Sequence, residues 1–142
     1  MRQIAEFVAV LACSLFAGAA VYLSLVEHPA RMECAIEIAA SKFPPSYRRA
    51  TITQATLAAV GLISSIAAWL ARASLLWVVG GVALGPVIPF TVILILPTNK
   101  LLLSPTLDKH SGQTGKLLAR WARMHAVKAF LVFWRSCYSF TF

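Results

Sequence analysis

Three long runs without a charged residue constrain the fold of this chain more than any other feature. They extend over Phe7–Val26, Ala50–Ala71 and Leu75–Leu96. At about 1.5 Å per residue, a helix of roughly 20 residues covers the ~30 Å hydrocarbon core of a bilayer. The chain is 59% hydrophobic and 13% charged, whereas soluble domains carry roughly 25% charged residues. The sequence therefore predicts an integral membrane protein built from helices.

The first run, Phe7–Val26, shares features with a secretory signal peptide. Arg2 precedes it, and Ala17-Gly18-Ala19 looks like a cleavage site. The apolar region of a signal peptide extends over only about 7–15 residues, however, and this run is longer. We therefore expect a retained helix.

Prolines and charged residues divide the chain into its expected helices. Pro29 should end or kink the first helix, because proline lacks a backbone donor and disfavours helical geometry in the preceding residue. A short interfacial helix over residues 31–42 should stop at Pro44-Pro45, and Pro86 and Pro89 should kink the third helix. The predicted fold class is all-α, an integral membrane up-down four-helix bundle forming one domain over residues 1–142. Its helices extend over about residues 4–27, 46–71, 74–97 and 114–138.

The basic residues indicate how the bundle is oriented. The formal net charge is +8, but the basic residues flank apolar runs, so anionic lipid headgroups explain them better than nucleic acid. Nine of them lie around loops one and three (residues 31, 42, 48, 49, 100, 109, 116, 120 and 123), against three on the other side (2, 72 and 135). Loops one and three are therefore expected to be cytoplasmic, with both termini on the opposite side.

The fourth helix carries a polar stripe. Trp121, His125 and Lys128 fall at positions i, i+4 and i+7, and Arg135 follows seven residues later. The other faces of this helix are mainly Leu, Val, Ala and Phe. Lipid cannot satisfy polar groups, so this stripe should face the bundle interior, a water-filled cavity or a partner.

Further polar residues converge on the same end of the bundle. His28 ends the first helix, Tyr47 and Gln54 begin the second, and Asn99 ends the third. Together with the stripe on the fourth helix, they predict an intramembrane site open towards one leaflet. The alternative is a network of hydrogen bonds that only holds the helices together.

Metal binding is a weaker interpretation of the same region. His28, His125, Glu27 and Glu33 offer nitrogen and oxygen ligands, but the chain has three histidines and no HxxH or HxxxH pair. The cysteines also lack the paired spacing of a disulfide framework or zinc site. We therefore expect no metal.

A GxxxG pattern lies in the third helix, at Gly81 and Gly85. Such a pattern allows two helix backbones to approach closely. It offers a contact either within the bundle or between the protomers of a homo-oligomer.

These motifs resemble the anthrone oxygenase family, a family of small four-helix membrane proteins, and the resemblance spans nearly the whole chain. The tail from Phe133 does not match the family, and Lys128 stands where the family usually has arginine. Lysine keeps the charge but loses the planar fork that grips an oxyanion bidentately. The resemblance is carried by Tyr22, Glu27-His28-Pro29-Ala30-Arg31, Tyr47-Arg48-Arg49-Ala50 with Gln54, Pro97-Thr98-Asn99, and Trp121 with His125.

The resemblance implies an oxygenase without flavin, haem or metal that oxidises a small hydrophobic aromatic substrate, an anthrone, with dioxygen. Such chemistry needs a base near neutral pH, for which histidine is the usual residue, and groups that hold an oxyanion. His125 or His28 is the expected base, and Arg31 is either a substrate ligand or the partner of Glu27 in a structural ion pair. Lys128, Asn99, Gln54 and Tyr47 are expected to stabilise the anion or orient the substrate, and Trp121 to pack against its rings.

A second interpretation comes from a different class of protein. The same polar cluster suits a non-enzymatic membrane protein that binds a lipid, a quinone or a partner subunit. The feature that distinguishes a ligand site from a purely structural network is an open, ligand-sized cavity.

Overall fold

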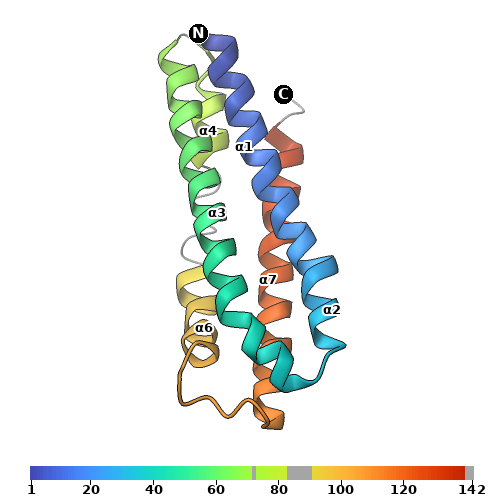
Figure 1. Cartoon of the computed structure of the whole chain (residues 1–142). Helices are drawn as coiled ribbons and strands as arrows, with labels where there is room; N and C mark the ends of the chain where they lie inside the picture. Colours follow the sequence, from blue (N-terminus) through green and yellow to red (C-terminus); the bar gives the residue numbers. More distant parts are fainter. Residues whose placement is uncertain (72, 83–90, 140–142) are drawn as a thin grey trace.

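The computed structural model describes residues 1–71, 73–82 and 91–139, with the side chains of residues 80, 81, 92 and 131–139 excepted. Every regular element in these ranges is a helix, and no strand occurs in them (Figure 1). Two of the elements, η1 and η2, are single π-helical turns. The elements are α1 (Arg2–Tyr22), η1 (Leu23–Glu27), α2 (His28–Met32), α3 (Ile36–Leu70), α4 (Leu76–Val82), η2 (Thr91–Ile95), α6 (Leu96–Leu102) and α7 (Gly112–Ser139).

The first helix does not end at Pro29, where the sequence predicted either an end or a kink. α1, η1 and α2 follow one another without a break as far as Met32. Proline removes one backbone donor, and the π-turn directly before it changes the hydrogen-bond register, since the His28 amide donates to the Leu23 carbonyl. The chain therefore remains helical, and Arg31 lies on a helix and not in a loop.

Pro44 and Pro45 do not stop a helix either. From Ile36 on, the two helices expected over residues 31–42 and 46–71 form one helix, α3, with both prolines inside it. A proline in a helix costs about 3 kcal/mol. Full burial of a large apolar side chain stabilises the folded state by roughly 1.5–3 kcal/mol. Phe43, directly before the prolines, is 1% exposed. Burial of Phe43 therefore offsets part of the local cost of the two prolines.

A π-turn also precedes Pro97, where the third helix was expected to end. η2 finishes two residues before this proline, just as η1 finishes two residues before Pro29, and α6 continues to Leu102. The kinks expected at Pro86 and Pro89, and the Gly81–Gly85 contact, lie outside the described residues.

Small residues allow the two longest helical stretches to pack closely. α1 buries Ala12 beside Gly61 of α3. A side chain added at Gly61 would meet the Cys13 sulfur at 3.3 Å. Close backbone approach of this kind is typical of helix pairs that lack large interdigitating side chains.

The larger apolar core lies at the end of the molecule where α2, the start of α3, α6 and the start of α7 meet, the lower end in Figure 1. α3 contacts α2, α6 and α7, so the elements that carry the predicted site residues pack against one another. The buried members of this core are Ala39, Ala40, Phe43, Ile95, Leu102, Leu118 and Trp121.

Two helical stretches, Arg2–Met32 and Ile36–Leu70, are long and apolar enough to cross a membrane, by length and composition. Only 28% and 11% of their apolar windows are buried, so neither resembles the core helix of a soluble protein. Ile52, Ile63 and Leu70, for example, are more than half exposed. An apolar surface of this extent is typical of contact with lipid or another protein.

Replacing Phe43 tests whether packing holds α3 together across its prolines. Its ring lies 5.2 Å from Trp121 and 5.7 Å from Tyr47, measured between centroids. Phe43→Ala should lower the free energy of unfolding by about 3–5 kcal/mol, because it leaves a cavity in the core. Ile52→Ala, on the same helix but 65% exposed, should change it by less than about 0.5 kcal/mol. Unfolding in detergent followed by circular dichroism measures both, and equal effects would contradict this role of Phe43.

Candidate functional site

A cavity of about 560 Å³ opens between the helices, and its lining is mainly apolar. Its volume falls in the range of small-molecule sites, roughly 300–1,000 Å³. The walls come from α1, η1, α2, α3, α4, η2, α6 and α7. The apolar lining residues are Phe16, Leu23, Phe43, Ala50, Ala55, Ala58, Ala59, Leu62, Val82, Ile95 and Trp121, and the polar ones are Arg31, Ser46, Tyr47, Thr51, Gln54, Thr91, Asn99, His125 and Lys128.

His125 lies in the wall of this cavity and is held on two sides. Its ring stacks on the Trp121 indole at 4.8 Å between centroids, with 24° between the planes. Its Nδ1 lies 3.0 Å from the Ser24 hydroxyl oxygen. The side chain is 4% exposed, so packing and hydrogen bonding fix its orientation.

Lys128 lies one helical turn beyond His125 and is 7% exposed. Its ammonium donates one long hydrogen bond, 3.4 Å, to Gln54 Oε1 on α3. Among the described residues no carboxylate forms an ion pair with it. A buried cation with so few partners is costly, and an anionic group in the cavity would stabilise it.

Asn99 and Tyr47 form a second polar contact in the cavity wall. The Asn99 amide nitrogen donates to the Tyr47 hydroxyl at 3.0 Å. Asn99 is 1% exposed, and its amide oxygen has no hydrogen-bond partner within the described part of the chain. A buried amide oxygen usually accepts a hydrogen bond. The Asn99 oxygen is therefore free to accept one from a donor group of a ligand.

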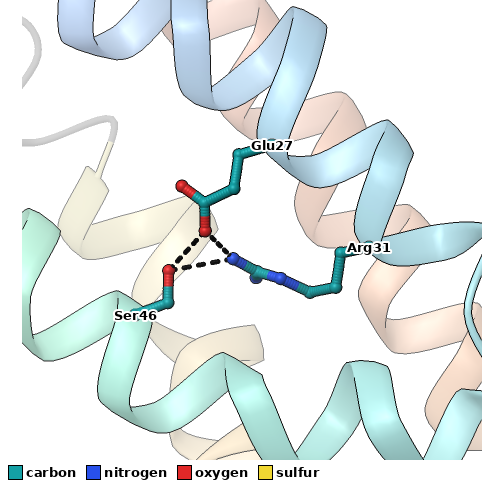
Figure 2. Close-up of polar contacts among 3 residues, drawn as sticks. All are labelled: Glu27, Arg31 and Ser46. Carbon is teal, nitrogen blue, oxygen red and sulfur yellow. Dashed lines mark hydrogen bonds and ion pairs between the residues drawn. The ribbon is translucent and has the colours of Figure 1, made fainter.

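Glu27, Arg31 and Ser46 form a closed triad that ties η1 and α2 to α3 (Figure 2). The Glu27 carboxylate accepts from the Arg31 guanidinium and, at 2.6 Å, from the Ser46 hydroxyl. The same guanidinium nitrogen donates to Ser46 at 2.9 Å. Arg31 lines the cavity, but its charge is neutralised within the triad.

His28 occupies a different place from His125. It is 3% exposed and is not among the residues that line the cavity. Its ring packs against Trp121 at 5.2 Å, tilted by 44°, and neither ring nitrogen has a hydrogen-bond partner within the described residues. Of the two histidines predicted as a base, His125 is the one in the cavity wall.

The structure thus gathers seven of the eight predicted site residues around one cavity, and leaves His28 beside it. In the ranges that the structure describes, no group of three or more His, Cys, Asp or Glu side chains is arranged to hold a metal ion. The seven are Arg31, Tyr47, Gln54, Asn99, Trp121, His125 and Lys128.

Two serines near the site, Ser24 and Ser46, were not predicted as site residues from the sequence. Ser24 lies in a long apolar run, where a serine attracts little notice, and Ser46 follows two prolines. A signal for Ser24 was present, since Ser24, Glu27, His28 and Arg31 fall at i, i+3, i+4 and i+7. Residues at this spacing share one face of a helix.

The fold and the cavity define a class of protein: the described part of the chain is all-helical, contains two candidate membrane spans, and encloses an apolar ligand-sized cavity lined by a histidine and a lysine. A family model described as anthrone oxygenase matches residues 43–134. The chain belongs to the anthrone oxygenase family. The matched segment includes Tyr47, Asn99, His125 and Lys128, while Glu27–Arg31 precedes it. No curated protein and no solved structure matches the chain.

The contribution of the triad to stability can be tested against a second ion pair in the same helical stretch. Glu27→Gln should lower the free energy of unfolding by about 1–3 kcal/mol, because it leaves the buried Arg31 guanidinium without its carboxylate. Arg2 and Glu6 form the same i,i+4 pair, but the Arg2 side chain is 58% exposed. Glu6→Gln should therefore cost less than about 1 kcal/mol. Denaturant titration of both variants measures the difference, and a Glu27 effect no larger than the Glu6 effect would show that the triad is unimportant for stability.

Proposed function

We propose that this protein is a membrane-embedded, cofactor-independent oxygenase. It removes a proton from an aromatic, polyketide-like substrate and allows the resulting anion to react with dioxygen. The observation that carries this proposal is that His125 and Lys128 line the same apolar cavity, one helical turn apart. Membership of the anthrone oxygenase family supports the same class of reaction.

We further propose that the chain crosses the membrane as an up-down four-helix bundle. α1 with α2 forms the first span and α3 the second, and the segments α4–α6 and α7 form the other two. The exposed apolar surface of the first two spans supports this arrangement. Loops one and three face the cytoplasm in this proposal, because nine of the basic residues lie around them.

The cavity suits a small hydrophobic aromatic substrate. Four alanines of α3 and the rings of Phe16 and Phe43 supply apolar surface, while the hydrogen-bonding groups gather around His125 and Asn99. A polycyclic phenolic compound has the same division, with flat apolar rings and a few oxygen atoms. An apolar wall also excludes water from the anion that forms there.

His125 is the proposed general base. A methylene group between aromatic rings and opposite a carbonyl is acidic, because the negative charge left after proton removal spreads onto the carbonyl oxygen. A positioned histidine accepts the proton, a contribution of roughly 10²–10⁴-fold in rate. His28 is less suited to this step, since it does not line the cavity.

Lys128 is the proposed partner of the developing oxyanion. Its ammonium lacks a carboxylate partner among the described side chains, so its charge is available to the substrate. Preorganised cations and hydrogen-bond donors in a water-poor site stabilise a developing charge strongly. Gln54, Asn99 and Tyr47 orient the substrate oxygen atoms from the opposite walls, and the Trp121 ring packs against the substrate rings.

The reaction balances without a further reductant. An anthrone loses the two hydrogen atoms of its methylene group, and one atom of dioxygen becomes the new quinone carbonyl. The second oxygen atom leaves as water with those two hydrogens. The electron-rich substrate anion supplies all four electrons to dioxygen.

Oxygen uptake by the purified protein with an anthrone tests the proposal, using the two buried histidines as a matched pair. Both contact Trp121 and are less than 5% exposed, so replacing either should disturb packing similarly. His125→Gln should lower kcat by about 10²–10⁴-fold, and His28→Gln should lower it far less. Uptake by the wild type should persist with a chelator.

Loss of activity in the His28 variant alone would overturn the assignment of the base. Binding of the anthrone without uptake above the spontaneous rate would instead support the non-enzymatic alternative.

Lys128 variants separate its charge from its packing. Lys128→Met keeps the length and apolar stem but removes the ammonium, and should lower kcat by about 10²-fold or more. Lys128→Arg restores a cation and should recover part of the rate, although its planar fork differs in geometry. Equal activity of the Met variant and the wild type would show that the oxyanion is held by other groups.

A further inference from the structure

We propose that Ser24 is a positioning residue that holds His125 with its proton on Nδ1 and so leaves Nε2 as the atom that accepts the substrate proton. This inference rests on the proposed function, in which His125 is the base. It adds a residue outside both the predicted site and the segment matched by the family model.

The two polar contacts of Ser24 favour one direction for its hydrogen bond with His125. Its hydroxyl oxygen lies 2.9 Å from the Ala20 carbonyl oxygen and 3.0 Å from His125 Nδ1. A hydroxyl carries one proton, and a carbonyl oxygen only accepts. With its proton donated to Ala20, the Ser24 oxygen is an acceptor towards His125. The imidazole must then be the donor, with its proton on Nδ1.

The tautomer of a neutral histidine is set by the hydrogen bond that one of its nitrogens makes. In the described part of the chain, the contact with Ser24 is the hydrogen bond that reaches the His125 ring. With Nδ1 protonated, the lone pair is on Nε2, and the ring itself forms part of the cavity wall. The opposite tautomer would place a proton on Nε2 and prevent it from acting as a base.

The local backbone brings Ser24 to this position. Ser24 lies in η1, the π-turn that precedes Pro29, and η1 contacts α7. Single π-turns within helices are frequent at functional sites, because the wider turn rotates the following side chains relative to a regular helix. The same turn that accommodates the proline therefore also carries the hydroxyl that faces His125.

Nitrogen-15 NMR of the histidine rings tests this assignment directly, on the full-length protein in detergent and without substrate. The chemical shifts of Nδ1 and Nε2 distinguish a protonated from an unprotonated nitrogen, and His125→Gln identifies which signals belong to His125. We expect a protonated Nδ1 in the wild type. This state should be lost or mixed in Ser24→Ala and retained in Ser24→Thr, since threonine in a helix also bonds the carbonyl of the preceding turn. A wild type protonated on Nε2, or an unchanged tautomer in Ser24→Ala, would overturn the proposal.

Kinetics give an independent readout. Ser24→Ala should lower kcat about three- to tenfold with little change in KM, because one neutral hydrogen bond biases an equilibrium by up to about that factor. Ser24→Thr should restore kcat. The tautomer measurement needs no turnover, so a wild type with the expected tautomer but no oxygen uptake would refute the proposed oxygenase and leave the role of Ser24 in setting the tautomer intact. A fall in kcat that threonine does not restore would count against the positioning role.

Discussion

Packing around the Trp121 indole holds together the end of the molecule that contains the cavity. Rings from three different elements pack against it: His28 from α2, Phe43 from α3 and His125 from α7. Its own nitrogen is buried without a hydrogen-bond partner in the described structure, a cost of about 1–3 kcal/mol. The apolar contacts must outweigh that cost. The indole therefore both closes the core and fixes the plane of the imidazole that we propose as the base.

Two prolines show why the helix boundaries could not be predicted from the sequence. Pro29 and Pro97 each lack a backbone donor, and that local loss predicted a helix end at both. In each case a π-turn ends two residues earlier, and the helix then continues. Whether a chain breaks or adapts at proline depends on packing by distant residues, such as Trp121 on Phe43 before Pro44. Local chemistry gives the cost of the proline but not the tertiary contacts that offset it.

The shared placement of three candidate residues could be predicted because the periodicity of one helix was sufficient. Trp121, His125 and Lys128 share one stripe of α7, and all three line the cavity. The place of His28 was not predictable in the same way. It follows a π-turn, and the extra residue in that turn changes the direction of every later side chain by about 100° relative to a regular helix. The contact between Ser24 and His125 was not predicted for a different reason, because its partner lies on α7, far along the chain.

The two cations of the cavity differ in a way that bears on the proposed chemistry. Arg31 is neutralised by Glu27 within a closed triad, whereas the contact that Lys128 makes with a polar side chain in the described part of the chain is a long hydrogen bond to the neutral Gln54. An anion that develops in the cavity would therefore be attracted to Lys128 more than to Arg31. An ammonium is a compact point charge, suited to a single oxygen atom, while a guanidinium fork suits a carboxylate. We therefore expect the charge to develop on one substrate oxygen near Lys128, within one helical turn of the base that takes the proton.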